Sequence, residues 1–200
     1  MSIARVRMVL WGLVIIVGIT ATLFTVYQQT QPKTAQAVKF GGPFTLVSTK
    51  GETFTEADFV GKPSMLFFGY TFCPDVCPTT LFEATSWKAE LGLTADDVNI
   101  IFVSVDPERD TPESMDTYLS AFGEGLIGLT GTVEQVNHVK KTFGVVGERV
   151  ETDGASDYLV NHTATLFLLD DKGDLFGTVA YGEAKDIAVA KLKRLMKIDA

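Results

Sequence analysis

Two short, mostly apolar runs separated by a helical stretch constrain the fold of this chain more than any other feature. The runs are PSMLFFGY, Pro63 to Tyr70, and VNIIFVSV, Val98 to Val105. Runs of this length and composition are typical of strands buried on both faces of a sheet. Between them, Pro78 to Leu91 has a broad apolar face at helical spacing and a proline where the first turn tolerates it. The order strand, helix, strand predicts an α/β domain.

The flanking stretches extend the same pattern. FTLVSTKGETFT has two alternating halves around Lys50-Gly51, which predicts an N-terminal hairpin. The remaining elements that we expect are a helix opened by Thr111-Pro112-Glu113, a strand at Leu126–Leu129, a helix at Thr132–Phe143 with capping-box spacing to Gln135, a polar turn at Glu148–Val160, a hairpin of Ala164–Asp170 and Leu175–Tyr181, and a helix at Ala184–Met196. Together they predict a mixed sheet flanked by helices, with both cysteines where the first central strand meets its helix. That layout is thioredoxin-like.

The N-terminus carries an uncharged run, MVLWGLVIIVGITATLFTV, from Met8 to Val26. At a rise of about 1.5 Å per residue, a helix of this length nearly spans a hydrocarbon core of about 30 Å. Arg5 and Arg7 precede it, which indicates a cytoplasmic N-terminus. A cleavable signal peptide is the alternative, since Ala35-Gln36-Ala37 resembles a cleavage site, but it lies well beyond the run. We expect a cytoplasmic tip at 1–7, a transmembrane anchor at 8–27, a linker at 28–43 and a folded domain at 44–200.

The net charge of the chain limits the kinds of molecule that it can bind. Only Arg5 and Arg7 precede the apolar run, so the rest of the chain has 15 basic residues against 25 acidic ones, a net charge of about −10. An acidic domain of this kind is a poor partner for nucleic acid or for anionic lipid surfaces. It is compatible with binding a cation.

The two cysteines of the chain, Cys73 and Cys77 in GYTFCPDVCPTTL, allow three interpretations. An exported location permits a small disulfide staple, although so short a loop adds little stability. At the start of a helix, unpaired N–H groups favour the thiolate, which is both a nucleophile and a soft metal ligand. Three intervening residues, rather than the two of C-x-x-C, weaken the case for dithiol–disulfide catalysis. They leave room for both sulfurs to converge on one ion.

A metal site needs a further ligand, and the chain has two histidines. His138 lies opposite the apolar positions of its predicted helix and should face water. His162 precedes an apolar strand whose start lies opposite the cysteine loop in thioredoxin-like folds. Two thiolates and one imidazole favour Cu(I), or Cu(II) with an added ligand. Structural zinc usually requires a fourth ligand, for which Asp75, Asp157 and Asp171 are candidates that no spacing distinguishes.

Three motifs in this order, GYTFCPDVCPTTL, VSVDPERDTPE and DYLVNHT, resemble those of the Sco/SenC family across the whole predicted domain. The resemblance implies a membrane-tethered copper-binding protein that assists assembly of the dinuclear copper centre of cytochrome c oxidase subunit II. Its copper ligands fall on Cys73, Cys77 and His162. Asp75 and Asp157 match acidic positions of the family, with second-sphere or docking roles implied. Asn161 departs from the acidic residue expected beside the histidine.

The resemblance also implies a location and further partners. Without a long Arg/Ser-rich leader, we expect a single-pass protein of the bacterial inner membrane with its C-terminal domain in the periplasm. There it would meet a copper donor and a thiol reductant. We expect Cys73 and Cys77 to bind copper only when reduced, and Cu(I) to pass to the acceptor by stepwise ligand exchange.

Two enzymatic interpretations compete with the copper chaperone. A thiol–disulfide oxidoreductase would use the same two sulfurs to reduce the acceptor's cysteines. Against it, Val160-Asn161-His162-Thr163 lacks the proline that such enzymes place before the strand facing the cysteines. A peroxiredoxin-like peroxidase is disfavoured because Thr71 lies only two residues before Cys73, which does not fit that motif.

Overall fold

The computed structural model describes residues 3, 7, 10–13, 16–22, 40–151 and 158–198. The chain divides into two compact units, Met1–Val38 and Lys39–Ala200. In the first unit the described residues are helical. Among all residues described, none of the helices combines the length and the apolar character required to cross a bilayer. Much of the proposed tip, anchor and linker (1–7, 8–27 and 28–43) lies outside the described residues, so that division remains a prediction.

The second unit is built on a seven-stranded mixed sheet, in the order β2-β1-β5-β4-β3-β8-β9. Parallel pairing joins β3 to β4 and β4 to β5, whereas the outer strands pair antiparallel. The strands are β1 (Thr45–Ser48), β2 (Thr53–Thr55), β3 (Ser64–Gly69), β4 (Asn99–Ser104), β5 (Leu126–Thr130), β8 (Thr165–Leu169) and β9 (Leu175–Ala180). Every residue of β3 is buried. The predicted N-terminal hairpin, central strands and mixed sheet are therefore confirmed.

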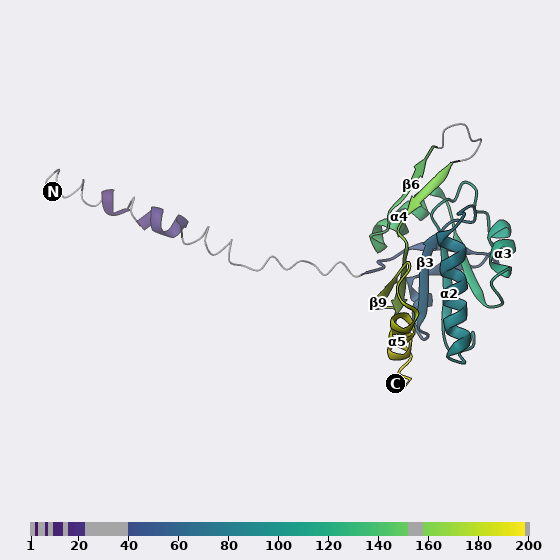
Figure 1. Ribbon diagram of the computed structural model, residues 1–200. Coiled ribbons are helices and arrows are strands. Elements are labelled where there is room, and N and C mark those ends of the chain that lie inside the picture. Colours follow the sequence, from purple (N-terminus) through teal and green to yellow (C-terminus); the bar gives the residue numbers. More distant parts are fainter. Residues whose placement is uncertain are drawn as a thin grey trace. The chain divides into compact units, whose positions relative to one another are not determined.

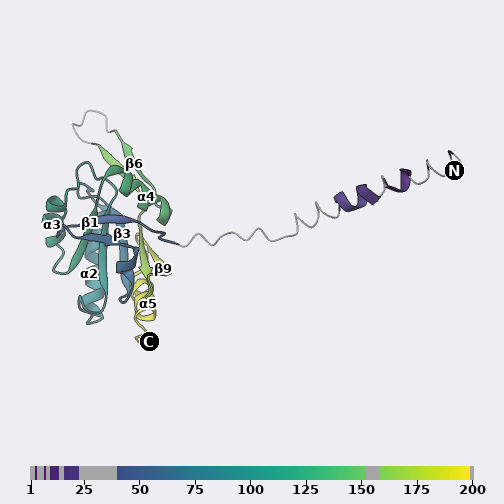
Figure 2. The same cartoon turned by 180° about the vertical axis from the view of Figure 1, so that it is seen from behind.

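Helices cover both faces of this sheet. They are η1 (Glu56–Phe59), α2 (Val76–Glu90), α3 (Pro112–Ser120), α4 (Val133–Phe143) and α5 (Lys185–Leu195). Successive side chains of a strand point to opposite faces. Phe67 contacts Phe102, which in turn contacts Tyr118 of α3, whereas the next residue, Phe68, contacts Phe143 of α4. Thus α3 and α4 cover opposite faces. Figure 1 shows α2 in front of the sheet, and Figure 2 shows it behind.

Local sequence signals account for the helix ends. The Thr111 hydroxyl accepts a hydrogen bond from the backbone N–H of Ser114, and Pro112 occupies the first turn of α3. Thr132 and Gln135 form the predicted capping box of α4. That helix ends at Gly144, whose φ of 64° lies in the left-handed region that glycine adopts without strain. These boundaries agree with those expected from the sequence.

One expectation was wrong. Glu148–Val160, expected as a polar turn, contains most of an antiparallel hairpin made of β6 (Gly147–Val150) and β7 (Leu159–His162). In Figure 1 this pair stands apart from the main sheet. The last three residues of β6 are exposed, so backbone pairing rather than apolar burial defines the strand, and its sequence lacks a hydrophobic pattern. His162 consequently ends β7 and does not lead directly into β8.

Candidate metal centre

The cysteine segment lies at the carboxyl end of β3, where the chain turns into α2. The backbone N–H of Cys73 donates to the carbonyl of Tyr70, which closes a tight turn directly after the strand. Cys77 lies in the first turn of α2 and is fully buried, whereas the side chain of Cys73 keeps a small opening to solvent. The N–H of Cys77 donates to Cys73 Sγ over 3.4 Å. The sulfur of Cys73 thus accepts one of the N–H groups that a helix start leaves unpaired.

The packing around Cys77 leaves no room for a side chain at Gly69. A Cβ added at Gly69 would lie 2.6 Å from Cys77 Sγ and 2.7 Å from Cε2 of Phe102. Both distances are far below ordinary van der Waals contact. Glycine at the end of β3 is therefore what allows the buried sulfur to approach the strand.

His162 completes the cluster from the hairpin. Its Nε2 lies 3.3 Å from Cys77 Sγ and 3.9 Å from Cys73 Sγ. Its Nδ1 lies 3.2 Å from the carbonyl oxygen of Thr163, which can only accept a hydrogen bond. We therefore assign the proton to Nδ1, which leaves the lone pair of Nε2 directed at the sulfurs. Metal-bound histidines commonly use their other nitrogen in this way.

The three side chains form one compact donor set. Their ligand atoms all lie within 4.8 Å of one another, and among the described residues no carboxylate belongs to the group. Cys73 and His162 line a pocket of about 350 Å³ together with Asp75 and Asn161, whose side chains are exposed. Both cysteines are free thiols, so the disulfide-staple interpretation has no support in this state of the molecule.

The two thiols have opposite electrostatic environments. The hydrogen bond from Cys77 lowers the pKa of Cys73 to about 4, and the backbone N–H groups of Asp75 and Cys77 act in the same direction against the effect of burial. Burial raises the pKa of Cys77, and the neighbouring Cys73 sulfur raises it further. At neutral pH the pair therefore holds one thiolate, on Cys73, and one thiol.

Asp110 fastens the cysteine loop to the sheet. Its side chain, 1% exposed, accepts hydrogen bonds from the hydroxyls of Thr71 and Ser104, each at 2.6 Å, and from the Thr71 backbone N–H. Burial raises the pKa of this carboxyl, and the bonds from Ser104 and Thr71 counter that effect. Asp110 belongs to the motif VSVDPERDTPE, in which the sequence alone assigns it no role. Asp110 follows β4, whose end lies beside the end of the parallel strand β3. That position in the sequence could have indicated that its carboxylate lies near the cysteine loop.

The other residues considered from the sequence lie outside the donor set. His138 is exposed and its Nε2 lies 2.8 Å from the carbonyl of Pro43, which confirms its placement at the surface. Asp171 follows the far end of β8, in the turn to β9. Asp75 lies at the rim of the pocket. Asp157 lies outside the described residues, so its role remains a prediction.

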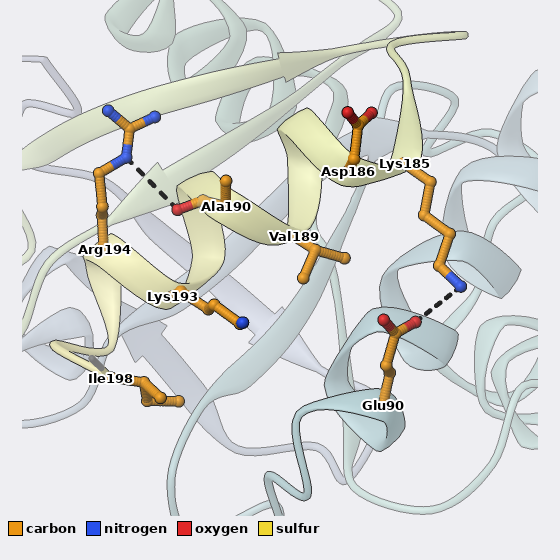
Figure 3. A pocket seen from close by; sticks show the side chains of 8 residues that line it. All are labelled: Glu90, Lys185, Asp186, Val189, Ala190, Lys193, Arg194 and Ile198. Carbon is orange, nitrogen blue, oxygen red and sulfur yellow. Dashed lines mark hydrogen bonds and ion pairs between the residues drawn. The ribbon is translucent and has the colours of Figure 1, made fainter. Parts of the chain in front are cut away.

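A larger cavity, of about 710 Å³, lies against α5 and the end of α2 (Figure 3). Lys185 and Glu90 form an ion pair across it, with 2.7 Å between Nζ and Oε2. The residues that line it, all within the described part of the chain, include no cysteine or histidine. Size alone therefore does not identify the reactive site, and the smaller pocket carries the soft ligands.

The comparisons agree with this geometry. The SCO1/SenC family model matches residues 32–197. The "Protein SCO2, mitochondrial" of Saccharomyces cerevisiae is 38% identical over 160 residues, which cover 78% of this chain and 53% of the yeast protein. The "Protein SenC" of Rhodobacter capsulatus is 36% identical over 171 residues, covering 80% and 76% of the two chains. The chain thus spans about half the length of the yeast relative and three quarters of the bacterial one.

Solved structures resemble the folded unit closely. Bradyrhizobium japonicum ScoI with copper bound is 43% identical, with a TM-score of 0.71 over 78% of this chain and 99% of that one. Yeast Sco1 with copper bound is 30% identical, with a TM-score of 0.71 over 81% and 91%. These matches confirm the thioredoxin-like fold predicted from the sequence.

Proposed function

Because the chain belongs to the SCO1/SenC family, we propose that it binds one copper ion through Cys73, Cys77 and His162. The observation that carries this proposal is the convergence of two sulfurs and one unprotonated imidazole nitrogen within 4.8 Å. Thiolate and imidazole ligands favour copper over harder ions, and the absence of a carboxylate from the group, among the described residues, disfavours a four-ligand zinc site. The copper-bound state of two structural relatives supports the same ion.

We further propose that the protein delivers this copper to the dinuclear centre of cytochrome c oxidase subunit II. Delivery by ligand exchange requires one ligand that an incoming thiolate can replace first. Cys73 is the candidate, because its sulfur borders the open pocket whereas Cys77 is 0% exposed. Both cysteines must be reduced, so a periplasmic reductant and a copper donor are the other expected partners.

The proposed setting is the outer face of a bacterial inner membrane. The apolar run from Met8 to Val26, preceded by Arg5 and Arg7, supports a single N-terminal anchor on sequence grounds. The linker at 28–43 would then tether the domain at 44–200 in the periplasm. Protease protection of the N-terminal tip in inside-out and right-side-out vesicles tests this orientation.

A copper titration of the reduced full-length chain in detergent, in competition with a chromophoric Cu(I) chelator, tests the site. Loss of second-sphere partners of a metal costs about 10–100-fold in affinity, so His162→Ala, which removes a ligand, should cost about 100-fold or more. His138→Ala is the matched control and should bind as the wild type does, since the exposed His138 lies outside the donor set and its Nε2 lies 2.8 Å from the Pro43 carbonyl oxygen. Equal affinity of the wild type and His162→Ala would overturn the three-ligand site.

A thiol–disulfide oxidoreductase is the second candidate, and one observation favours it. Cys73 combines a pKa of about 4 with access to solvent, while Cys77 is buried behind it, as for an attacking and a resolving thiol. The two functions separate in an assay with an oxidised, copper-free acceptor peptide. Catalytic turnover that persists in His162→Ala would favour the enzyme, and its absence in the wild type would dismiss it.

A further inference from the structure

Arg109 lies among three aromatic side chains beside the proposed copper site. Its Cζ is 3.6 Å from the centroid of the Tyr158 ring, 4.7 Å from that of Phe72 and 5.7 Å from that of Tyr70. The arginine side chain is only 14% exposed. A guanidinium so largely removed from water interacts more strongly with aromatic faces than an exposed one does.

Hydrogen bonds fix the plane of this guanidinium. Its Nε donates to Asp106, which lies just beyond β4, and its Nη1 donates to the backbone carbonyl of Tyr158 over 3.0 Å. The hydroxyl of Tyr158 in turn donates to Asp106 over 2.7 Å. Arg109, Asp106 and Tyr158 therefore each contact the other two, and we call this set the arginine clamp.

The clamp reaches chain neighbours of both halves of the donor set. Phe72 directly precedes Cys73, and Tyr158 directly precedes the strand that ends at His162. Tyr70 lies between the halves, since its ring meets the His162 ring edge to face with 5.7 Å between centroids. Arg109 thus touches a neighbour of the sulfur side and a neighbour of the imidazole side at once.

The hairpin needs such a contact because its backbone pairing does not attach it to the main sheet. Within the described residues, β7 pairs with β6 and with no strand of the seven-stranded sheet. Apart from its short connections to α4 and β8, side-chain contacts hold it in place. Val160 is buried, Lys140 donates to the Gly147 carbonyl over 3.1 Å, and the clamp secures the end at which β7 begins.

We propose that Arg109 is a positioning residue of the copper site: it holds the start of β7 against the cysteine loop so that Nε2 of His162 faces both sulfurs. This inference rests on the proposed function and concerns how the same site is assembled. A planar guanidinium can stack on Tyr158 while donating to two oxygens in different directions. A lysine ammonium keeps the charge but cannot reproduce that geometry.

The test compares copper affinity in the full-length chain after single substitutions. Arg109→Met and Arg109→Lys should each weaken Cu(I) binding about 10–100-fold, the range measured for residues that orient metal ligands. Arg149→Met is the matched control. Arg149 stacks on the same Tyr158 ring, with 3.7 Å between Cζ and the centroid, but is 51% exposed and pairs with Glu108 and Glu151 at the surface. Its loss should change affinity about twofold at most.

A double-mutant cycle distinguishes positioning from a general effect on the fold. If Arg109 acts through His162, adding Arg109→Met to His162→Ala should cost little further affinity, because the ligand being positioned is already gone. Full additivity of the two losses would overturn the inference, as would wild-type affinity in both Arg109 variants. Either result leaves the proposed function standing if His162→Ala alone still weakens binding.

A second variant keeps the test decisive if Arg109→Met does not fold. Tyr158→Leu removes the ring and its hydroxyl but leaves the ion pair between Arg109 and Asp106 in place. It should weaken copper binding in the same direction and be equally non-additive with His162→Ala. A Tyr158→Leu variant that folds and binds copper as the wild type does would contradict the clamp.

Discussion

The sulfur half and the imidazole half of the site are held by different kinds of structure. Cys73 and Cys77 follow a central strand of a seven-stranded sheet, and Asp110 and Gly69 fix the loop and the room around it. His162 ends a two-stranded hairpin with exposed residues, which is secured to the domain by side-chain contacts and by its short connections to α4 and β8. The sulfurs therefore occupy a preformed and rigid position, whereas the position of the imidazole depends on a few contacts that single substitutions can remove.

This difference has a chemical consequence for a protein proposed to receive and release an ion. A rigid pair of sulfurs keeps the ligand geometry without reorganisation. An imidazole on a hairpin can be displaced at a smaller cost, because few backbone hydrogen bonds oppose its movement. We infer that copper capture depends on both halves, and that once an incoming thiolate has replaced Cys73, the imidazole gives up the ion at a small cost.

The largest predicted effect concerns the sulfur half, and it tests whether Cys73 is already a thiolate before copper binds. Between pH 5 and pH 8 an ordinary thiol, with a pKa of about 8.5, increases its thiolate fraction several hundred-fold. The pKa of Cys73 is about 4, so its alkylation by iodoacetamide should change less than about twofold over that range and decline only as the pH falls toward 4. Mass spectrometry of the reduced, copper-free chain measures the rate.

The dependence of the Cys73 alkylation rate on pH, measured in His162→Ala, separates the contributions of the sulfur half and the imidazole half. The hydrogen bond from Cys77 is the main cause of the low pKa, so the profile should stay nearly flat without the imidazole. A rate that rises steeply with pH in the wild type would show that Cys73 is an ordinary thiol. A steep rise in the variant alone would show that the imidazole, rather than the hydrogen bond from Cys77, activates the sulfur.

A smaller effect is expected from filling the space beside Cys77. Gly69→Ala should reduce the free energy of unfolding by about 1–3 kcal/mol and weaken copper binding, because the added methyl group cannot be accommodated without moving Cys77 or Phe102. Gly177→Ala in β9 is the matched control, since nothing lies within 4 Å of a Cβ built there. Urea unfolding and chelator competition measure the two quantities. If both alanine variants are equally stable, the sulfur half is less rigid than we infer.

The smallest effect is predicted for Asp75, between the two cysteines. Its side chain is exposed and makes no capping hydrogen bond to α2. Asp75→Asn should therefore leave the unfolding free energy within about 0.5 kcal/mol and the copper affinity nearly unchanged. An effect confined to transfer onto the acceptor would assign Asp75 to docking. A large loss of copper affinity would instead make it part of the metal site.

The sequence predicts the structure around the sulfur half well and the hairpin that carries the imidazole half poorly. The buried strands, the helix caps and the cysteine loop follow from apolar runs and capping residues, and their boundaries agree with the structure to within about two residues. The β6–β7 hairpin was missed because its exposed strands carry no apolar periodicity. His162 was still selected as a candidate ligand, and the structure brings its Nε2 close to both sulfurs.

Asp110 and Arg109 were missed for another reason. Their roles depend on contacts across the edge of the sheet, with Thr71 and Ser104 in one case and with Tyr158 in the other. Tyr158 lies 49 residues further along the chain from Arg109, so no local pattern links the two. Charged residues that follow a buried parallel strand are a general indication of a nearby site, and the motif that contains both residues fits it.

The most direct test of the central claim is X-ray absorption at the copper edge of the reduced, copper-loaded full-length chain. We predict a first shell of two sulfur atoms and one nitrogen atom around a single copper ion in the wild type. His162→Ala should lose the nitrogen and keep the sulfurs. A shell without nitrogen in the wild type, or one that His162→Ala leaves unchanged, would contradict a site built from Cys73, Cys77 and His162.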